Sequence, residues 1–169
     1  MNKFLIVIIL ISTIFSQSFK DLTERPTYNP IKIEKPIIFD GVVDNQEWSK
    51  AQIATNFNGS GTFQGQPSDL RTEARLFYDE KNIYVGFIAY VDKEDLRYSI
   101  TKRDNLDEKD DRVWINIDAF DDEALTYGIG VSAGGVQIDG RATYGFDKSL
   151  DIIYESKVSV HDDRYEAEL

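Results

Sequence analysis

The stretch TEARLFYDEKNIYVGFIAYVD, residues 72–92, decides the fold class. Residues 72–79 and residues 83–91 can each be divided into two faces of alternate side chains, and polar residues lie mainly in the first segment. A period of two is typical of β-strands, and Glu80-Lys81-Asn82 between the two segments favours a hairpin turn. In residues 83–91 both faces carry large apolar side chains, which predicts a central strand that is buried on both sides.

The same alternation continues towards the C-terminus. It recurs at residues 112–120, 125–132, 136–139, 152–160 and 164–169, and residues 31–39 predict one or two short strands before it. Regular antiparallel hairpins with almost no helix predict an all-β fold, an antiparallel β-sandwich of jelly-roll or immunoglobulin-like type. We expect residues 31–169 to form this one domain, cut short in its last strand.

The segment DGVVDNQEWSKA, residues 40–51, predicts a tight turn followed by one short helix. Asp40 and Gly41 form a turn pair in which glycine can adopt a positive φ. Asp44 is suited to cap the helix, with a glutamate three residues later as in a capping box. Trp48 has the spacing of a hydrophobic staple, so we expect a buried structural anchor in preference to a sugar-stacking platform.

The N-terminal residues predict export. Residues 1–16 combine Lys3 with an apolar run that is short for a membrane span and ends at the small residue Ser16, as in a secretory signal peptide. An uncleaved anchor is the alternative. Residues 17–30 contain two prolines and mixed charge, and we interpret them as a linker. The predicted location is the periplasm, the outer membrane or the exterior of the cell.

Composition excludes several classes of function. The chain lacks cysteine, which excludes disulfides, thiol catalysis and Cys-ligated metal, and its one histidine, His161, excludes a His-pair metal site. We expect His161 to be a surface residue at a hairpin end. Thirty acidic against nineteen basic residues give a net charge of −11, which disfavours nucleic acid and anionic lipid as partners and is compatible with a neutral glycan. No acidic pair stands out as a hydrolytic site, so we predict no enzyme activity.

A candidate binding face lies on the hairpin of residues 112–132. The predicted register places Trp114 and Asn116 opposite Gly130 and Gly128, with Asp118 next along the strand. An aromatic ring beside planar polar groups on one surface is suited to a neutral sugar, because the ring stacks on the sugar and the polar groups bond its hydroxyls. The alternative is that Trp114 simply covers the strand glycines.

A dense acidic loop is a candidate calcium site. Asp104, Asp107, Asp110 and Asp111 supply the carboxylate oxygens that calcium prefers, although their spacing is not that of an EF-hand. The alternative is a solvated loop whose charge is offset by basic neighbours.

Six motifs occur in the order found in one family of domains. They are DGVVDNQEW (40–48), TEARLFYDEKNIYVGFIAYVD (72–92), KRD (102–104), DDRVWINIDAFDD (110–122), YGIGVSAGGVQIDG (127–140) and RYEAEL (164–169). Together they resemble the carbohydrate-binding family 9-like domain, a DOMON-type β-sandwich. The chain is similar, more narrowly, to the N-terminal domain of exported bacterial proteins with a predicted C-terminal outer-membrane β-barrel.

This resemblance implies non-catalytic carbohydrate binding, sometimes with bound calcium, in polysaccharide breakdown or uptake. Any glycoside hydrolase activity would then reside in another part of the protein. Arg103 of the KRD motif matches a polar position of the family, and Tyr154 stands where relatives often carry a tryptophan of the sugar clamp. The alternative function is a periplasmic interaction or plug domain that serves an outer-membrane β-barrel.

Overall fold

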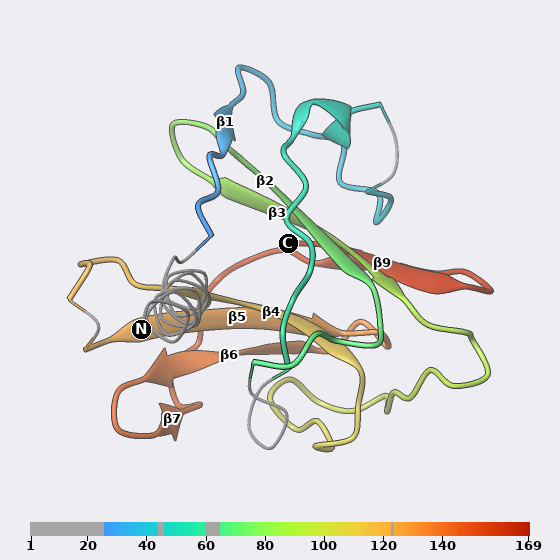
Figure 1. Cartoon of the computed structure of the whole chain (residues 1–169). Coiled ribbons are helices and arrows are strands. Elements are labelled where there is room, and N and C mark those ends of the chain that lie inside the picture. Colours follow the sequence, from blue (N-terminus) through green and yellow to red (C-terminus); the bar gives the residue numbers. More distant parts are fainter. Residues whose placement is uncertain (1–25, 44–45, 60–64, 123) are drawn as a thin grey trace, which may run out of the picture.

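The computed structural model describes residues 26–43, 46–59, 65–122 and 124–169, and it forms two β-sheets that face each other (Figure 1). One sheet has the strand order β1-β2-β3-β9-β8 and the other the order β4-β5-β6-β7. β1 runs parallel to β2, and every other pairing is antiparallel. The predicted all-β sandwich is therefore confirmed. The strands are β1 (Ile31–Lys32), β2 (Thr72–Tyr78), β3 (Ile83–Tyr90), β4 (Arg112–Ile117), β5 (Thr126–Ser132), β6 (Gln137–Ala142), β7 (Phe146–Asp147), β8 (Lys157–Val160) and β9 (Arg164–Glu168).

Three local predictions differ from the structure. The expected helix is a 3₁₀ turn, η1 (Trp48–Lys50), whose N-cap residue Glu47 makes no capping bond with its side chain, and the predicted cap Asp44 lies outside the described residues. β7 pairs with β6 between the predicted strands of residues 136–139 and 152–160, where no strand was predicted. Residues 152–156, predicted as the start of a strand, are not strand, and the Ile152 N–H donates to the side-chain carboxylate of Asp139 in β6 and not to a backbone carbonyl of a strand. Among the described residues, no helix is long and apolar enough to cross a membrane.

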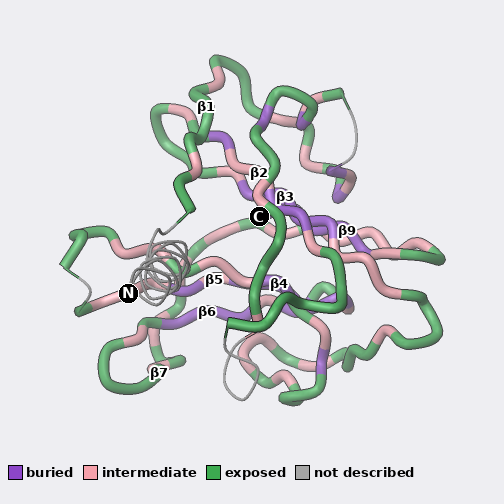
Figure 2. Tube along the Cα trace, in the orientation of Figure 1, coloured by how far each residue is buried: buried purple, intermediate pink, exposed green. Residues whose placement is uncertain are grey.

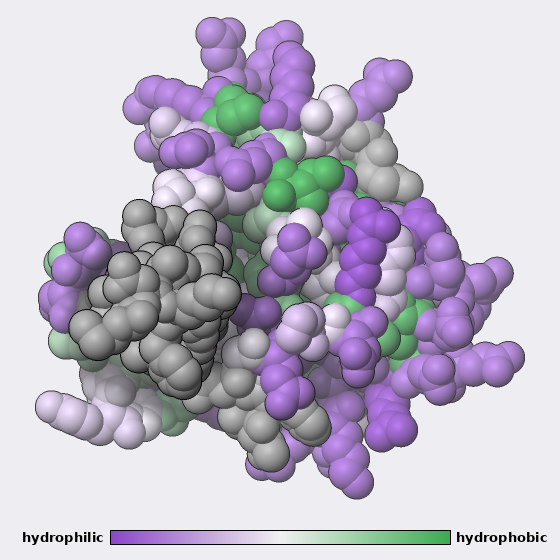
Figure 3. All heavy atoms as spheres, in the orientation of Figure 1, coloured by the Kyte–Doolittle hydropathy of each residue, from purple (hydrophilic) through white to green (hydrophobic). Residues whose placement is uncertain are grey.

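The main core lies between the two sheets. Figure 2 shows buried residues along β2, β3 and β9 of one sheet and along β5 and β6 of the other. The residues that share this core are Ala74, Val85, Phe87, Val113, Val131, Ala133, Tyr165, Ala167 and Leu169. The side of the molecule seen in Figure 3 is mostly hydrophilic. These core residues supply the apolar packing between the two sheets.

A second core covers the opposite face of the five-stranded sheet. Trp48 is fully buried there and stacks on Phe77 at 5.2 Å between ring centroids. A Cβ atom added to Gly86 would lie 2.7 Å from Val43 and 3.1 Å from the Trp48 ring, so the glycine permits this close approach. β3 is consequently covered on both faces, as its sequence predicted.

Glu168 of β9 fixes this N-terminal segment to the sheet. Its carboxylate is fully buried and accepts hydrogen bonds from the Asp40 and Gly41 N–H groups at 2.9 and 2.6 Å and from Trp48 Nε1 at 2.9 Å. Burial raises the pKa of Glu168, although these donors oppose the rise. The left-handed φ of +86° at Gly41 allows the turn that directs both N–H groups towards one carboxylate.

Glu166, two residues earlier on the same face of β9, completes the attachment. Its Oε2 accepts the Val43 N–H at 2.6 Å, and its Oε1 lies 2.8 Å from Arg164 Nε and 3.3 Å from His161 Nε2. His161 is half-buried against this carboxylate and is not the simple surface residue that we expected. The burial of Glu166 and Glu168 was not predicted, because charged residues at alternate positions of a strand are typical of a solvent-facing side.

Candidate functional site

The outer face of the four-stranded sheet carries a floor of glycines beneath Trp114. The predicted register is found, with Trp114 opposite Gly130 and Asn116 opposite Gly128. A Cβ atom added to Gly128 would lie 1.9 Å from Trp114 Cζ2, and one added to Gly130 would lie 2.5 Å from Cε3. The indole therefore lies directly on the β5 backbone, and its other face is directed away from the sheet.

Two neighbours fix the orientation of this indole. Trp114 Nε1 donates to Asn116 Oδ1 at 2.7 Å. Phe146 of β7 meets the Trp114 ring in a T-shaped contact at 5.3 Å and 65°, and it lies over Gly140 of β6. Such edge contacts are favourable for aromatic pairs, so the ring is held in place from two sides.

A hollow of about 350 Å³ opens beside Trp114. Its lining residues come from β4, β6, β7 and the residue after β7: Arg112, Trp114, Asn116, Ile138, Phe146 and Lys148. Ile138, Phe146 and Lys148 were not among the predicted contacts, because they lie outside the hairpin of residues 112–132. Arg112 lies on that hairpin but was not predicted as a contact. The turn segment before Phe146, which contains Gly145, is the sequence signal that identifies a further hairpin.

Asp118 does not join this surface. β4 ends at Ile117, and Asp118 Oδ1 accepts the N–H groups of Phe120 and Asp122 at 3.1 and 3.4 Å in the turn that follows. This carboxylate organises the turn, so the predicted binding role of Asp118 has no support in its position.

Arg103 lies on the opposite, inner face of β6. Its guanidinium bonds to Asp139 (Nε to Oδ1, 2.8 Å), to Gln137 Oε1 at 2.7 Å and to the Ile152 carbonyl at 2.6 Å. Burial opposes the charge of Arg103, but the hydrogen bond and charge of fully buried Asp139 outweigh burial and raise the pKa of Arg103. Arg103 and Trp114 were predicted in one set of contacts, but they lie on opposite faces of the four-stranded sheet.

Tyr154 belongs to this inner side as well. It packs against the main core, and its ring lies 5.2 Å from the Arg103 guanidinium carbon. The Tyr154 hydroxyl is 2.6 Å from the Gly130 carbonyl and accepts the Ile138 N–H at 3.0 Å. The Tyr154 hydroxyl is thus hydrogen-bonded to the backbone of the sheet. This position contrasts with the exposed aromatic contact that the resemblance implied.

The pH dependence of stability in a Tyr154→Phe variant tests the hydrogen bonds of the Tyr154 hydroxyl. Burial raises the pKa of Tyr154 from 10.0 to about 12, so the stability it contributes is complete below pH 10 and is lost as pH rises through 12. We expect Tyr154→Phe to lower the free energy of unfolding by about 1 kcal/mol at pH 8 and to flatten its decline between pH 10 and 12. Urea unfolding at pH 8 and pH 11 measures both effects. Tyr144→Phe, at a fully exposed ring, is the control, and an unchanged slope in Tyr154→Phe would contradict the assignment.

The predicted calcium quartet is not assembled. Asp110 accepts from Ser99 Oγ and the Asp107 N–H, and Asp111 accepts the Arg97 N–H, so these carboxylates hold their own loop together. In the part of the chain that the structure describes, the acidic cluster with metal-ligand spacing is a different one, consisting of Asp104, Asp139 and Asp151.

The guanidinium of Arg103 lies within this second acidic cluster. Its Nε is 3.7 Å from Asp104 Oδ2 and 4.0 Å from Asp151 Oδ1, in addition to its bond with Asp139. A permanent cation thus already offsets these carboxylates. Asp104 is also docked on β6, since its N–H donates to the Gln137 carbonyl at 3.1 Å and its Oδ1 accepts the Asp139 N–H at 2.9 Å.

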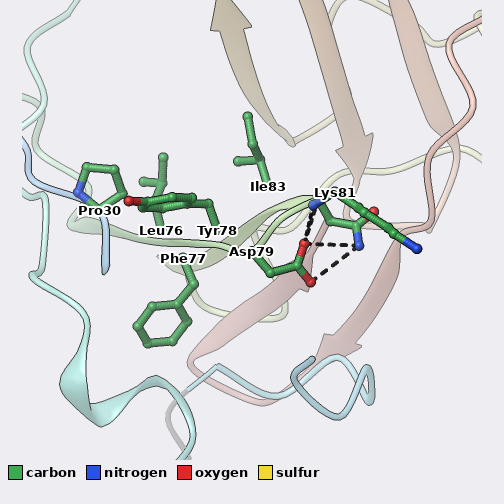
Figure 4. A pocket seen from close by; sticks show the side chains of 8 residues that line it. Pro30, Leu76, Phe77, Tyr78, Asp79, Lys81 and Ile83 are labelled. Carbon is green, nitrogen blue, oxygen red and sulfur yellow. Dashed lines mark hydrogen bonds between the residues drawn. The ribbon is translucent and has the colours of Figure 1, made fainter. Parts of the chain in front are cut away.

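A more apolar hollow of about 420 Å³ lies at the β2–β3 turn (Figure 4). Tyr78 lies close to Pro30 there, with Ile83 nearby, while Phe77 points to the other side of the strand. The one carboxylate that lines it, Asp79, accepts the Lys81 and Asn82 N–H groups at 2.7 Å. These bonds, first that from Lys81, lower the pKa of Asp79 to about 2, so its charge serves the hairpin turn.

Comparison with known proteins identifies the family. The model of the "Carbohydrate family 9 binding domain-like" family matches residues 38–168. The fold is similar to that of a carbohydrate binding module family 9 from Caldicellulosiruptor kristjanssonii in complex with cellotriose, with a TM-score of 0.58 and 20% identity. The match covers 84% of this chain and 65% of that module. A comparison with curated proteins gives no match. Because the family model spans most of the sequence, the chain belongs to the carbohydrate family 9 binding domain-like family.

Proposed function

We propose that this domain binds carbohydrate without catalysis, at the hollow beside Trp114 on the outer face of β4–β7. The observation that carries the proposal is the position of the indole, which rests on glycines and is fixed by Asn116 and Phe146. An aromatic face held in this way can stack on the apolar face of a sugar ring at little entropic cost. The volume of about 350 Å³ is within the range of small-molecule sites.

The composition of the hollow supports binding without hydrolysis. Glycoside hydrolysis uses two carboxylates on either side of the scissile bond. The six residues that line the hollow include an amide and two cations but no aspartate or glutamate. Membership of the family and the cellotriose complex of the similar module agree with a carbohydrate ligand. We infer further that the protein is exported and serves polysaccharide breakdown or uptake, from the signal-like residues 1–16 and the family.

Tryptophan fluorescence tests the proposal, since Trp48 is buried and Trp114 is the partly accessible indole. Titration of the purified protein with a panel of oligosaccharides, with and without calcium, is expected to give a saturable change. Trp114→Ala should weaken binding at least about tenfold, since the stacked ring contributes on the order of 1.4 kcal/mol. Calorimetry measures the affinity of this variant.

Two control variants locate the site. Tyr78→Ala removes an aromatic ring from the hollow of Figure 4 and should leave the affinity unchanged. Asp151→Ala removes an exposed carboxylate of the Arg103 cluster and should also leave it unchanged. Affinity that survives Trp114→Ala but is lost in either control variant would move the site to that surface, and a flat response to every saccharide would refute the proposed function.

A further inference from the structure

We propose that the sugar bound beside Trp114 carries an acidic group, a carboxylate or a sulfate ester. This inference rests on the proposed function and names the class of glycan, and it replaces the neutral glycan that the overall charge suggested. The reason is local: the charge of the hollow is opposite to that of the chain.

The charged residues that line the hollow have the opposite sign to the net charge of the protein. Thirty acidic and nineteen basic residues make carboxylates the more frequent charged group, yet the two charged residues of this hollow, Arg112 and Lys148, are both basic. Four other hollows described in the structure each contain at least one carboxylate, among them Asp79, Glu155, Asp69 and Asp95. The hollow beside Trp114 differs from these four because its cations have no carboxylate beside them in the lining.

Within the part of the chain that the structure describes, these two cations bond to backbone carbonyls, which leave their charges available. Arg112 Nη1 donates to the Asp107 carbonyl at 3.4 Å, and Lys148 Nζ donates to the Asp104 carbonyl at 3.2 Å. A carbonyl orients a cation but carries no net charge to neutralise it. Arg103, on the inner face of the same sheet, shows the contrast, because the buried carboxylate of Asp139 neutralises it.

The polar groups of the hollow are donors. Asn116 Oδ1 already accepts a hydrogen bond from Trp114 Nε1. The amide N–H groups of Asn116 can therefore donate hydrogen bonds to a ligand. Together with a guanidinium and an ammonium, the hollow thus offers three donor groups, and this set fits an anionic acceptor. The planar guanidinium is especially suited to carboxylate and sulfate oxygens, which it can bind in a bidentate manner.

The spacing along β4 is suitable for such a ligand. Arg112, Trp114 and Asn116 occupy alternate positions on one face of the strand, and positions two apart are separated by about 6.8 Å. A sugar stacked on Trp114 therefore brings an exocyclic acidic group towards Arg112 or towards Lys148. A densely charged polymer such as nucleic acid remains a disfavoured partner, because the net charge of −11 repels it at long range.

The experiment compares trigalacturonate with its methyl ester, which has the same rings without the charge, and with a sulfated oligosaccharide. We expect both acidic ligands to bind at least about tenfold more tightly than the ester, and the preference to weaken with added salt. The double variant Arg112→Gln/Lys148→Gln should lose this preference. Lys35→Gln/Lys50→Gln removes the same net charge from exposed residues of the N-terminal segment and should keep it.

The outcomes distinguish this inference from the proposed function. Equal binding of acid and ester, or a preference that survives in Arg112→Gln/Lys148→Gln, would overturn the acidic ligand while carbohydrate binding stands. Inorganic sulfate that binds as tightly as the sulfated oligosaccharide would also overturn it, because the ring on Trp114 would then contribute nothing. A protein that binds none of the three saccharides would refute both.

Discussion

Replacement of Glu168 by alanine is expected to lower the free energy of unfolding by about 4 kcal/mol. The substitution removes a buried carboxylate that accepts from the Asp40 and Gly41 N–H groups and from the Trp48 indole. Each donor left without a partner in the interior costs about 1–3 kcal/mol. A loss of this size is a large fraction of the stability of a typical domain. Urea unfolding, followed by the fluorescence of buried Trp48, measures it.

Two further variants define this effect. Glu168→Gln keeps the shape and one acceptor oxygen of the side chain, so we expect an intermediate loss. Glu94→Ala removes an exposed glutamate and should change the stability by less than about 0.5 kcal/mol. If Glu168→Ala were as mild as Glu94→Ala, the N-terminal segment would be held by its apolar contacts alone, and the role assigned to this carboxylate would be wrong.

Gly128→Ala is expected to weaken saccharide binding by about fivefold to 150-fold, although residue 128 does not line the hollow. The reason is that holding the indole in its place against the added methyl group costs about 1–3 kcal/mol. The added methyl carbon would lie 1.9 Å from Trp114 Cζ2 and 2.6 Å from Cε2, so the indole must leave its place. That movement breaks the Trp114–Asn116 bond and the packing against Phe146. Calorimetric titration gives the affinity, and the shifted emission of Trp114 reports the displacement.

Gly145→Ala is the matched control for this substitution. A Cβ atom added there meets nothing within 4 Å, and Gly145 lies in the short loop between β6 and β7. We expect unchanged affinity and unchanged emission. Normal binding by Gly128→Ala with a shifted emission spectrum would show that the position of the indole is irrelevant to the ligand.

Strand periodicity and turn residues predict most of this fold. The alternation in residues 72–91 defines β2 and β3, and Asp79 with Asn82 closes the turn between them. The same reasoning found the pairing of Trp114 with Gly130, because a register shifted by one residue would turn the buried face of a strand outwards. β7 was missed because two residues are too few to show a period.

The composition of the site was less accessible to sequence reasoning. Arg103 and Trp114 are polar and aromatic residues only eleven positions apart, and nothing in their spacing says that β6 lies between their side chains. The loop that carries Arg103 is placed by Asp139, a tertiary contact 36 positions away. Glu166 and Glu168 were missed for a related reason, because their burial depends on a segment from the other end of the sequence.

The attachment of Trp48 to Glu168 also sets an order of events during folding. The two residues are 120 positions apart, and the Asp40 bond to the same carboxylate spans 128. Contacts of such separation form late, because the intervening chain loses entropy when its ends meet. On the ribosome, where the N-terminus emerges first, the segment around Trp48 must wait for β9 to be synthesised. The first part of the domain to be made is therefore among the last to reach its native position.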